Sequence, residues 1–80
     1  MQIKTLNDAV RIANVCEKYK DIDIDAMCET KRYVVDAKSI MGLSILMNGG
    51  DIYFQVHGDM GTIRRFNEEI RGLEKHGEEI

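Results

Sequence analysis

Residues 21–37 read DIDIDAMCETKRYVVDA, and this stretch decides the fold. Over residues 21–28 apolar and acidic side chains alternate with a period of two, which is typical of a strand with one buried and one solvated face. Residues 29–32 are polar and suit a turn, and residues 33–37 resume as a second strand. The stretch therefore predicts an antiparallel hairpin with buried Ile22, Ile24, Ala26 and Cys28, and with solvated Asp21, Asp23 and Asp25.

A strand and a helix are expected before the hairpin. Residues 2–4 form a short strand candidate, and Thr5 and Asp8 then supply a capping signal in front of an apolar-periodic run. Apolar side chains recur at helical spacing after it and predict a helix over residues 6–20, with one buried stripe formed by Ala9, Ile12, Ala13, Cys16 and Tyr19.

Two helices and a strand are expected after the hairpin. The nearly all-apolar residues 39–47 predict a short helix with Ser39 as its N-cap and Asn48-Gly49-Gly50 as its stop. Alternation over residues 51–57 predicts the last strand. A closing helix follows, with Ile63, Phe66, Ile70 and Leu73 on its buried face and an end before Gly77.

Asp59 and Thr62 are both candidates for the N-cap of the closing helix. We expect Asp59, because a cap at Thr62 would place Arg64 and Arg65 in the first turn, where their charge opposes the helix dipole.

Length and charge limit the classes of function. The chain has 80 residues, with 11 Lys+Arg against 14 Asp+Glu and a net charge of −3, which predicts a single domain over residues 1–80. No overall positive field is present to attract nucleic acid or an anionic membrane, and no apolar run is long enough for a membrane span. We therefore expect a cytoplasmic protein with neither kind of partner.

Cofactor and metal chemistry are not expected either. Cys16 and Cys28 fall on predicted core faces without metal-type spacing. The three aspartates of the hairpin resemble the start of a calcium loop, but Ala26 and Arg32 stand where that loop requires glycine and glutamate. No Cys-His or Ser-His-Asp set can be assembled, so we expect no enzyme activity.

The segment Lys38-Ser39-Ile40-Met41-Gly42, which follows a hairpin and opens a short helix, resembles the K-S-I-M-G segment of the HPr family of the bacterial phosphotransferase system. The expected order of elements, β-α-β-β-α-β-α, also agrees with that family. The resemblance implies an α+β open-faced β-sandwich, in which a four-stranded antiparallel sheet carries three helices on one face.

The phosphate-carrying motif of that family is absent. HPr proteins carry a phosphoryl group on a histidine at the start of the first helix, and Thr5 takes that position here, with Asn7 and Asp8 replacing the family's arginine and proline. A phosphate ester on threonine is too stable to serve as a relay, and Asp8 would repel phosphate. His57 is expected far from this helix end and His76 in the last helical turn, so neither is expected to substitute.

The resemblance also assigns a regulatory site and a docking surface. It implies regulatory phosphorylation at Ser39, where a helix N-terminus favours an anion, although Ser39 also serves simply as a cap. It implies docking of enzyme I, transporter subunits and regulators on an exposed apolar patch. The docking residues expected on this basis are Lys38, Ile40, Met41 and Ser44.

Three functions follow as hypotheses. The first is a regulatory or protein-binding module without a phosphohistidine, with phosphotransferase components, a serine kinase or a transcriptional regulator as partners. The second is a divergent phosphocarrier, and the third is a structural or oligomerisation module in which the apolar helix face is a subunit interface. The chain is expected to be a monomer or a weak homodimer. An alternative to docking is that Met41 and Ile45 pack under the glycine-rich loop that follows.

Overall fold

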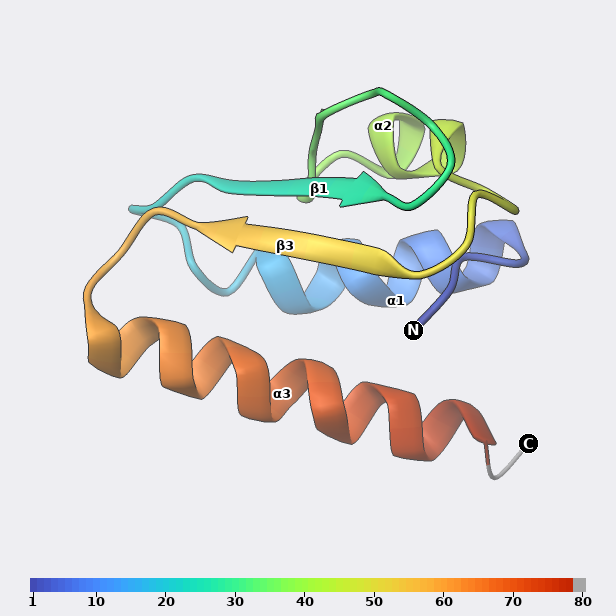
Figure 1. The fold of residues 1–80 in the computed structure, drawn as a ribbon. Helices are drawn as coiled ribbons and strands as arrows, with labels where there is room; N and C mark the ends of the chain where they lie inside the picture. Colours follow the sequence, from blue (N-terminus) through green and yellow to red (C-terminus); the bar gives the residue numbers. More distant parts are fainter. Residues whose placement is uncertain (79–80) are drawn as a thin grey trace.

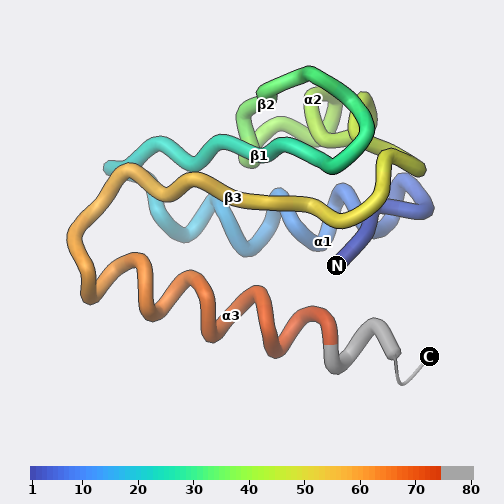
Figure 2. The backbone as a smooth tube through the Cα atoms, viewed as in Figure 1, coloured from blue at the N-terminus to red at the C-terminus, as the bar shows by residue number. Residues whose placement is uncertain are grey.

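A computed structural model describes the backbone of residues 1–78 and the side chains of residues 1–74. The chain forms an α+β fold in which three helices accompany an antiparallel sheet of three strands, in the order β2-β1-β3 (Figures 1 and 2). In chain order the elements are α1 (Leu6–Cys16), β1 (Ile24–Cys28), β2 (Val35–Asp36), α2 (Ile40–Ile45), β3 (Ile52–Val56) and α3 (Met60–Glu78).

The expectation of a four-stranded sheet is wrong. Residues 2–4 form no strand, and their only ladder contact is an isolated bridge between Gln2 and Asp51. The backbone N–H groups of Lys4 and Thr5 donate to the Asp8 carboxylate at 2.9 and 3.0 Å. Because the cap of α1 uses these donors, they are not available to a sheet ladder, and the segment ends after one bridge.

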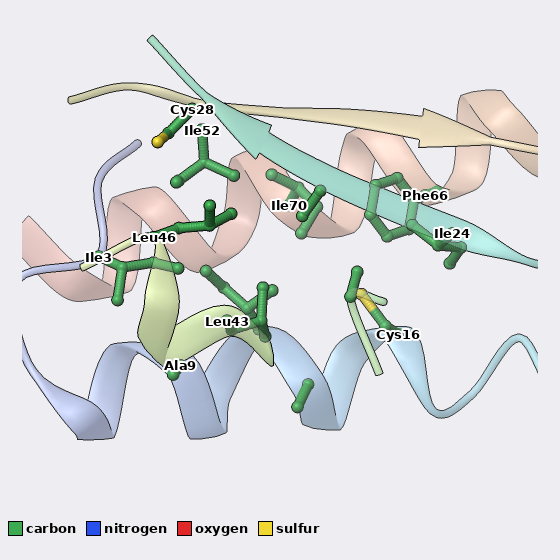
Figure 3. Packing of buried hydrophobic residues seen from close by; sticks show 14 residues of the cluster. Ile3, Ala9, Cys16, Ile24, Cys28, Leu43, Leu46, Ile52, Phe66 and Ile70 are labelled. Atoms are coloured by element: carbon green, nitrogen blue, oxygen red, sulfur yellow. The ribbon is translucent and has the colours of Figure 1, made fainter. Parts of the chain in front are cut away.

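The sheet has one buried and one solvent-facing side. β1 and β3 pair antiparallel with Ile24 opposite Val56 and Cys28 opposite Ile52. Burial alternates along β1 as the sequence predicts, and the inward side chains meet those of the helices beneath the sheet in a single core (Figure 3). The core also takes Ile12 from α1, Leu43 from α2 and Phe66 from α3, all fully buried.

The first helix is shorter than the expected span of residues 6–20. It ends at Cys16, and the bonds from Lys18 N to Val15 O and from Tyr19 N to Cys16 O are short i to i−3 turns. Tyr19 still lies against the core, with its ring edge-on to Phe66 at 5.7 Å. The apolar stripe thus continues past the helix in a tighter backbone.

The second arm of the hairpin is also shorter than expected. Only Val35 and Asp36 pair with β1, and Tyr33 and Val34 are exposed. The turn is drawn toward the glycine-rich loop, because the Thr30 hydroxyl and N–H both donate to Gly49 O, at 2.8 and 3.1 Å. These contacts replace the tight hairpin that the sequence predicts.

The ends of the last two helices are partly as expected. Ser39 caps α2 as expected, but the helix ends at Ile45 and not at Met47, because the bonds from Leu46 N to Leu43 O and from Met47 N to Ser44 O are i to i−3 turns. The turns that follow contain Asn48 at φ 60° and Gly50 at φ 89°, both in the left-handed region. Asp59 is the cap of α3, since its Oδ1 accepts from Thr62 N at 2.8 Å. The expected end before Gly77 is wrong, because α3 continues to Glu78.

Candidate docking surface on the second helix

The start of α2 is built from the residues of the HPr-like segment. The Ser39 hydroxyl accepts a hydrogen bond from Gly42 N at 3.0 Å, which satisfies one of the free donors of the first turn. A Cβ on Gly42 would lie 3.2 Å from the Val35 side chain and 3.4 Å from Asp36 O. Glycine therefore lets α2 pack closely against β2, and it fixes where Ser39 stands.

The opposite side of α2 presents apolar side chains to solvent. Met41 is 80% exposed, Ile45 47% and Ile40 40%, whereas Leu43 and Leu46 on the other side are fully buried. We call Ile40, Met41 and Ile45 the α2 patch. Ser44, which the sequence also places at the docking surface, is half-buried and donates to Met41 O at 2.6 Å. The patch is exposed, so Met41 and Ile45 do not pack under the loop that follows.

Lys38 has a contact set that the sequence does not indicate. Its ammonium donates to Tyr19 O at 2.6 Å and to Ile22 O at 2.7 Å, both in the connection between α1 and β1. These bonds attach the start of α2 to a segment far away in the sequence. The structure thus gives Lys38 a positioning role, and its part in docking stays a prediction.

Lys31 holds the end of α2 in a similar way. Its ammonium donates to Ile45 O and Met47 O, both at 2.9 Å, where helical carbonyls lack partners. No basic residue lies in the last turn of α2 itself. A lysine in a polar turn gives no sequence signal for this role.

The start of α1 lacks a free anion-binding position. Thr5 is the N-cap, and Asp8 completes a capping box with it. Burial of the Asp8 carboxyl opposes its ionisation, but hydrogen bonds from the Lys4 and Thr5 backbone outweigh that effect and lower its pKa. An ionised carboxylate therefore lies in the first turn of α1, where its negative charge would repel a phosphate.

His57 does not reach this end of α1. His57 follows β3, whose last residues lie at the opposite end of the molecule from the start of α1 (Figure 1). Its Nε2 lies 2.9 Å from Asp25 Oδ2, on the solvent-facing side of the sheet. The side chain of His76 lies outside the described part of the chain.

We find no site for metal or cysteine chemistry among the described residues. No group of three or more histidine, cysteine or carboxylate side chains among them could hold a metal ion. Cys16 and Cys28 are buried, free thiols, and burial raises the pKa of Cys16 to about 12. No helix in the described part of the chain is both long and apolar enough to cross a membrane.

Comparison with protein-family models, with curated proteins and with solved structures finds no match to this chain.

Proposed function

We propose that the chain is a regulatory protein-binding module related to HPr, which docks partners through the α2 patch and does not relay phosphate. The observation that carries the proposal is the exposure of Ile40, Met41 and Ile45 on a helix whose other side is fully buried. Flexible methionine suits a surface that binds several partners, and a contiguous apolar patch marks an interaction site. The partners proposed are phosphotransferase components, a serine kinase or a transcriptional regulator.

Ser39 is the proposed regulatory residue of the module. It immediately precedes Ile40, so a phosphate on its hydroxyl would place two negative charges at the rim of the α2 patch. The first turn of α2 has no acidic residue that would repel this phosphate. Phosphorylation would therefore change which partners bind, weakening those with acidic rims and strengthening those that present arginine.

The absence of a relay is proposed from the start of α1. Thr5 offers a hydroxyl in place of the family's histidine, and the Asp8 carboxylate already accepts the nearby N–H groups. Incubation with enzyme I and phosphoenolpyruvate should leave no acid-labile phosphate on the chain. A stoichiometric acid-labile label would instead identify a working phosphocarrier, and mapping it would test His57 and His76.

The docking surface is tested by a pair of exposed apolar residues. Met41 is 80% exposed on α2 and Leu6 is 57% exposed on α1, so the same substitution is tolerated structurally at both positions. Met41→Asp should weaken binding to a phosphotransferase regulator at least tenfold in calorimetric titration, and Leu6→Asp should leave it unchanged. Equal losses in the two variants, or none, would contradict docking at the α2 patch.

A further inference from the structure

One edge of the sheet is open over half of β3. In the ladder with β1, His57 N donates to Asp23 O and Glu29 N donates to Asp51 O, so the odd-numbered residues of β3 direct their backbone groups toward β1. The even-numbered residues direct theirs to the other edge, where Ile52 N donates to Met1 O at 2.8 Å. Within residues 1–74, Phe54 and Val56 have no backbone partner on that edge.

The open part of this edge, at Phe54 and Val56, lacks the residues that normally block edge pairing. Protected edges contain lysine, proline or a bulge, or are covered by another element. β3 reads IYFQV, which has no charged residue and no proline and is rich in strand-forming side chains. The N-terminal segment uses the edge at Asp51 and Ile52 and then turns away to begin α1.

One side of the third helix lies beside the open edge of β3. α3 runs alongside β3 on the side away from β1 (Figure 1), and Phe66 contacts Phe54 with ring centroids 5.2 Å apart. Met60 and Asn67 precede Glu74 by fourteen and seven residues, so all three share a side of α3. Glu74 is 3.1 Å from the Met1 ammonium, which places this side of α3 under the N-terminal segment and its continuation.

This side of α3 is exposed next to the open part of the edge. Met60 is 72% exposed and Asn67 is exposed. Both line a shallow hollow of about 260 Å³, together with Ile63, Arg64, Glu68 and Arg71. Two arginines against one glutamate give the hollow a positive balance.

We propose that the free edge at Phe54 and Val56 is a docking site for a single extended strand of a partner protein, which completes the sheet as its fourth strand. Backbone pairing supplies the affinity, as in other cases of strand addition. On the face of the partner strand that is directed toward α3, apolar side chains meet Met60 and Ile63, and carboxylates meet Arg64 and Arg71.

The test uses amide hydrogen exchange read residue by residue. In the free protein, Phe54 and Val56 amides should exchange at least tenfold faster than those of Tyr53 and Gln55, which pair with β1. The probe is the heptapeptide Glu-Thr-Val-Thr-Val-Thr-Glu, added at millimolar concentration, whose glutamates and valines all lie on one face of the extended chain. It should slow exchange at Phe54 and Val56 at least tenfold and leave Tyr53 and Gln55 unchanged.

Two controls isolate the backbone contact. The same peptide, N-methylated at alternate residues on one edge or on the other, should lose binding in one of the two forms, because only one set of its amides faces β3. Val56→Pro removes one donor from the edge without touching the ladder to β1 and should weaken peptide binding at least tenfold. Undiminished binding in every control would overturn the proposal, and the methylated peptides keep that test valid if Val56→Pro does not fold.

A fused form of the probe distinguishes a peptide that binds too weakly from an edge that accepts no strand. In the antiparallel register of Gln2 with Asp51, about four residues added before Met1 would reach Val56. The heptapeptide fused there has a high effective concentration and should protect Phe54 and Val56 and block the free peptide. No protection in the fused protein would show that the edge accepts no strand. Protection in the fusion alone would show that it does not accept a partner's strand.

Discussion

The two helices α1 and α2 both begin with a hydroxyl cap, but they are held in different ways. α1 has its capping partners within its own first turn, where Thr5 and Asp8 form a closed capping box. α2 is six residues long, and distant lysines support it, Lys38 near its start and Lys31 at its end. α1 is therefore specified locally and has a carboxylate in its first turn, whereas α2 depends on tertiary contacts and has no acidic residue in its first turn. The Asp36 carboxylate, three residues before the Ser39 cap, accepts from Lys38 N at 2.9 Å.

The largest effect is expected at the lysine that holds the start of α2. Lys38→Met leaves Tyr19 O and Ile22 O without their donor, and the loss of charged hydrogen bonds should reduce the free energy of unfolding by about 2–3 kcal/mol. Urea unfolding measures the change. Lys20→Met is the matched control, because Lys20 is exposed and makes no side-chain bond within residues 1–74; it should change stability by less than about 0.5 kcal/mol. Equal losses in both variants would refute the support of α2 by Lys38.

A smaller effect is expected at the capping box of α1. Asp8→Ala removes the acceptor for Lys4 N and Thr5 N and should cost about 1–2 kcal/mol in the same unfolding measurement. Asn7→Ala, an exposed change in the same turn, is its control. A loss as large in Asn7→Ala would show that the cap does not depend on the carboxylate.

The Asp8 prediction also has a definite pH dependence. The pKa of this carboxyl is lowered in the folded chain, because backbone hydrogen bonds outweigh its burial. A group of this kind stabilises the protein above its unfolded pKa, and the contribution is lost as the pH falls through the folded value. The stability gap between wild type and Asp8→Ala should thus be constant above about pH 5 and should close below about pH 4. A gap that widens on acidification would contradict the assignment.

The other lysine contact is more exposed, so its effect should be smaller. Lys31→Met removes the donor to Ile45 O and Met47 O and should cost about 1 kcal/mol. Amide exchange should become faster in the last turn of α2 and stay unchanged in α1. Faster exchange throughout both helices would show that Lys31 supports the whole fold and not the end of α2.

The difference between the helices explains how much of the molecule could be predicted. The caps of α1 and α2 and the alternation of β1 are local patterns, and all three are confirmed. The fourth strand was wrong because the capping box claims the N–H groups of Lys4 and Thr5, a competition that a strand pattern does not reveal. The second strand was too long because Thr30 and Lys31 bind groups near α2 and its following loop.

The features of the candidate site also differ in whether local sequence patterns could predict them. Exposure of Ile40 and Met41 follows from helical spacing and could be predicted. The bonds of Lys38 to Tyr19 O and Ile22 O could not, because they join residues that only the tertiary fold brings together. The open edge of β3 was hidden for a related reason, since the expected first strand would have covered it.

The smallest change in stability, and the sharpest comparison, is expected from a charge placed at the two helix starts. Ser39→Asp keeps an oxygen acceptor for Gly42 N and adds a negative charge to a helix whose first turn has no acidic residue, so its melting temperature should equal or exceed that of wild type. Thr5→Asp adds the same charge beside the Asp8 carboxylate, and like-charge repulsion should lower the melting temperature. Ser39→Ala loses the cap and should cost about 1 kcal/mol.

The Ser39 variants should rank differently in partner affinity than in melting temperature. Ser39→Asp changes the charge at the rim of the α2 patch, so titration should show altered affinity although the fold is unchanged. Ser39→Ala leaves that charge as it is, so its affinity should match wild type in spite of the lower melting temperature. If Ser39→Asp melts well below wild type, the start of α2 does not tolerate an anion, and regulation by phosphate at Ser39 fails on that result.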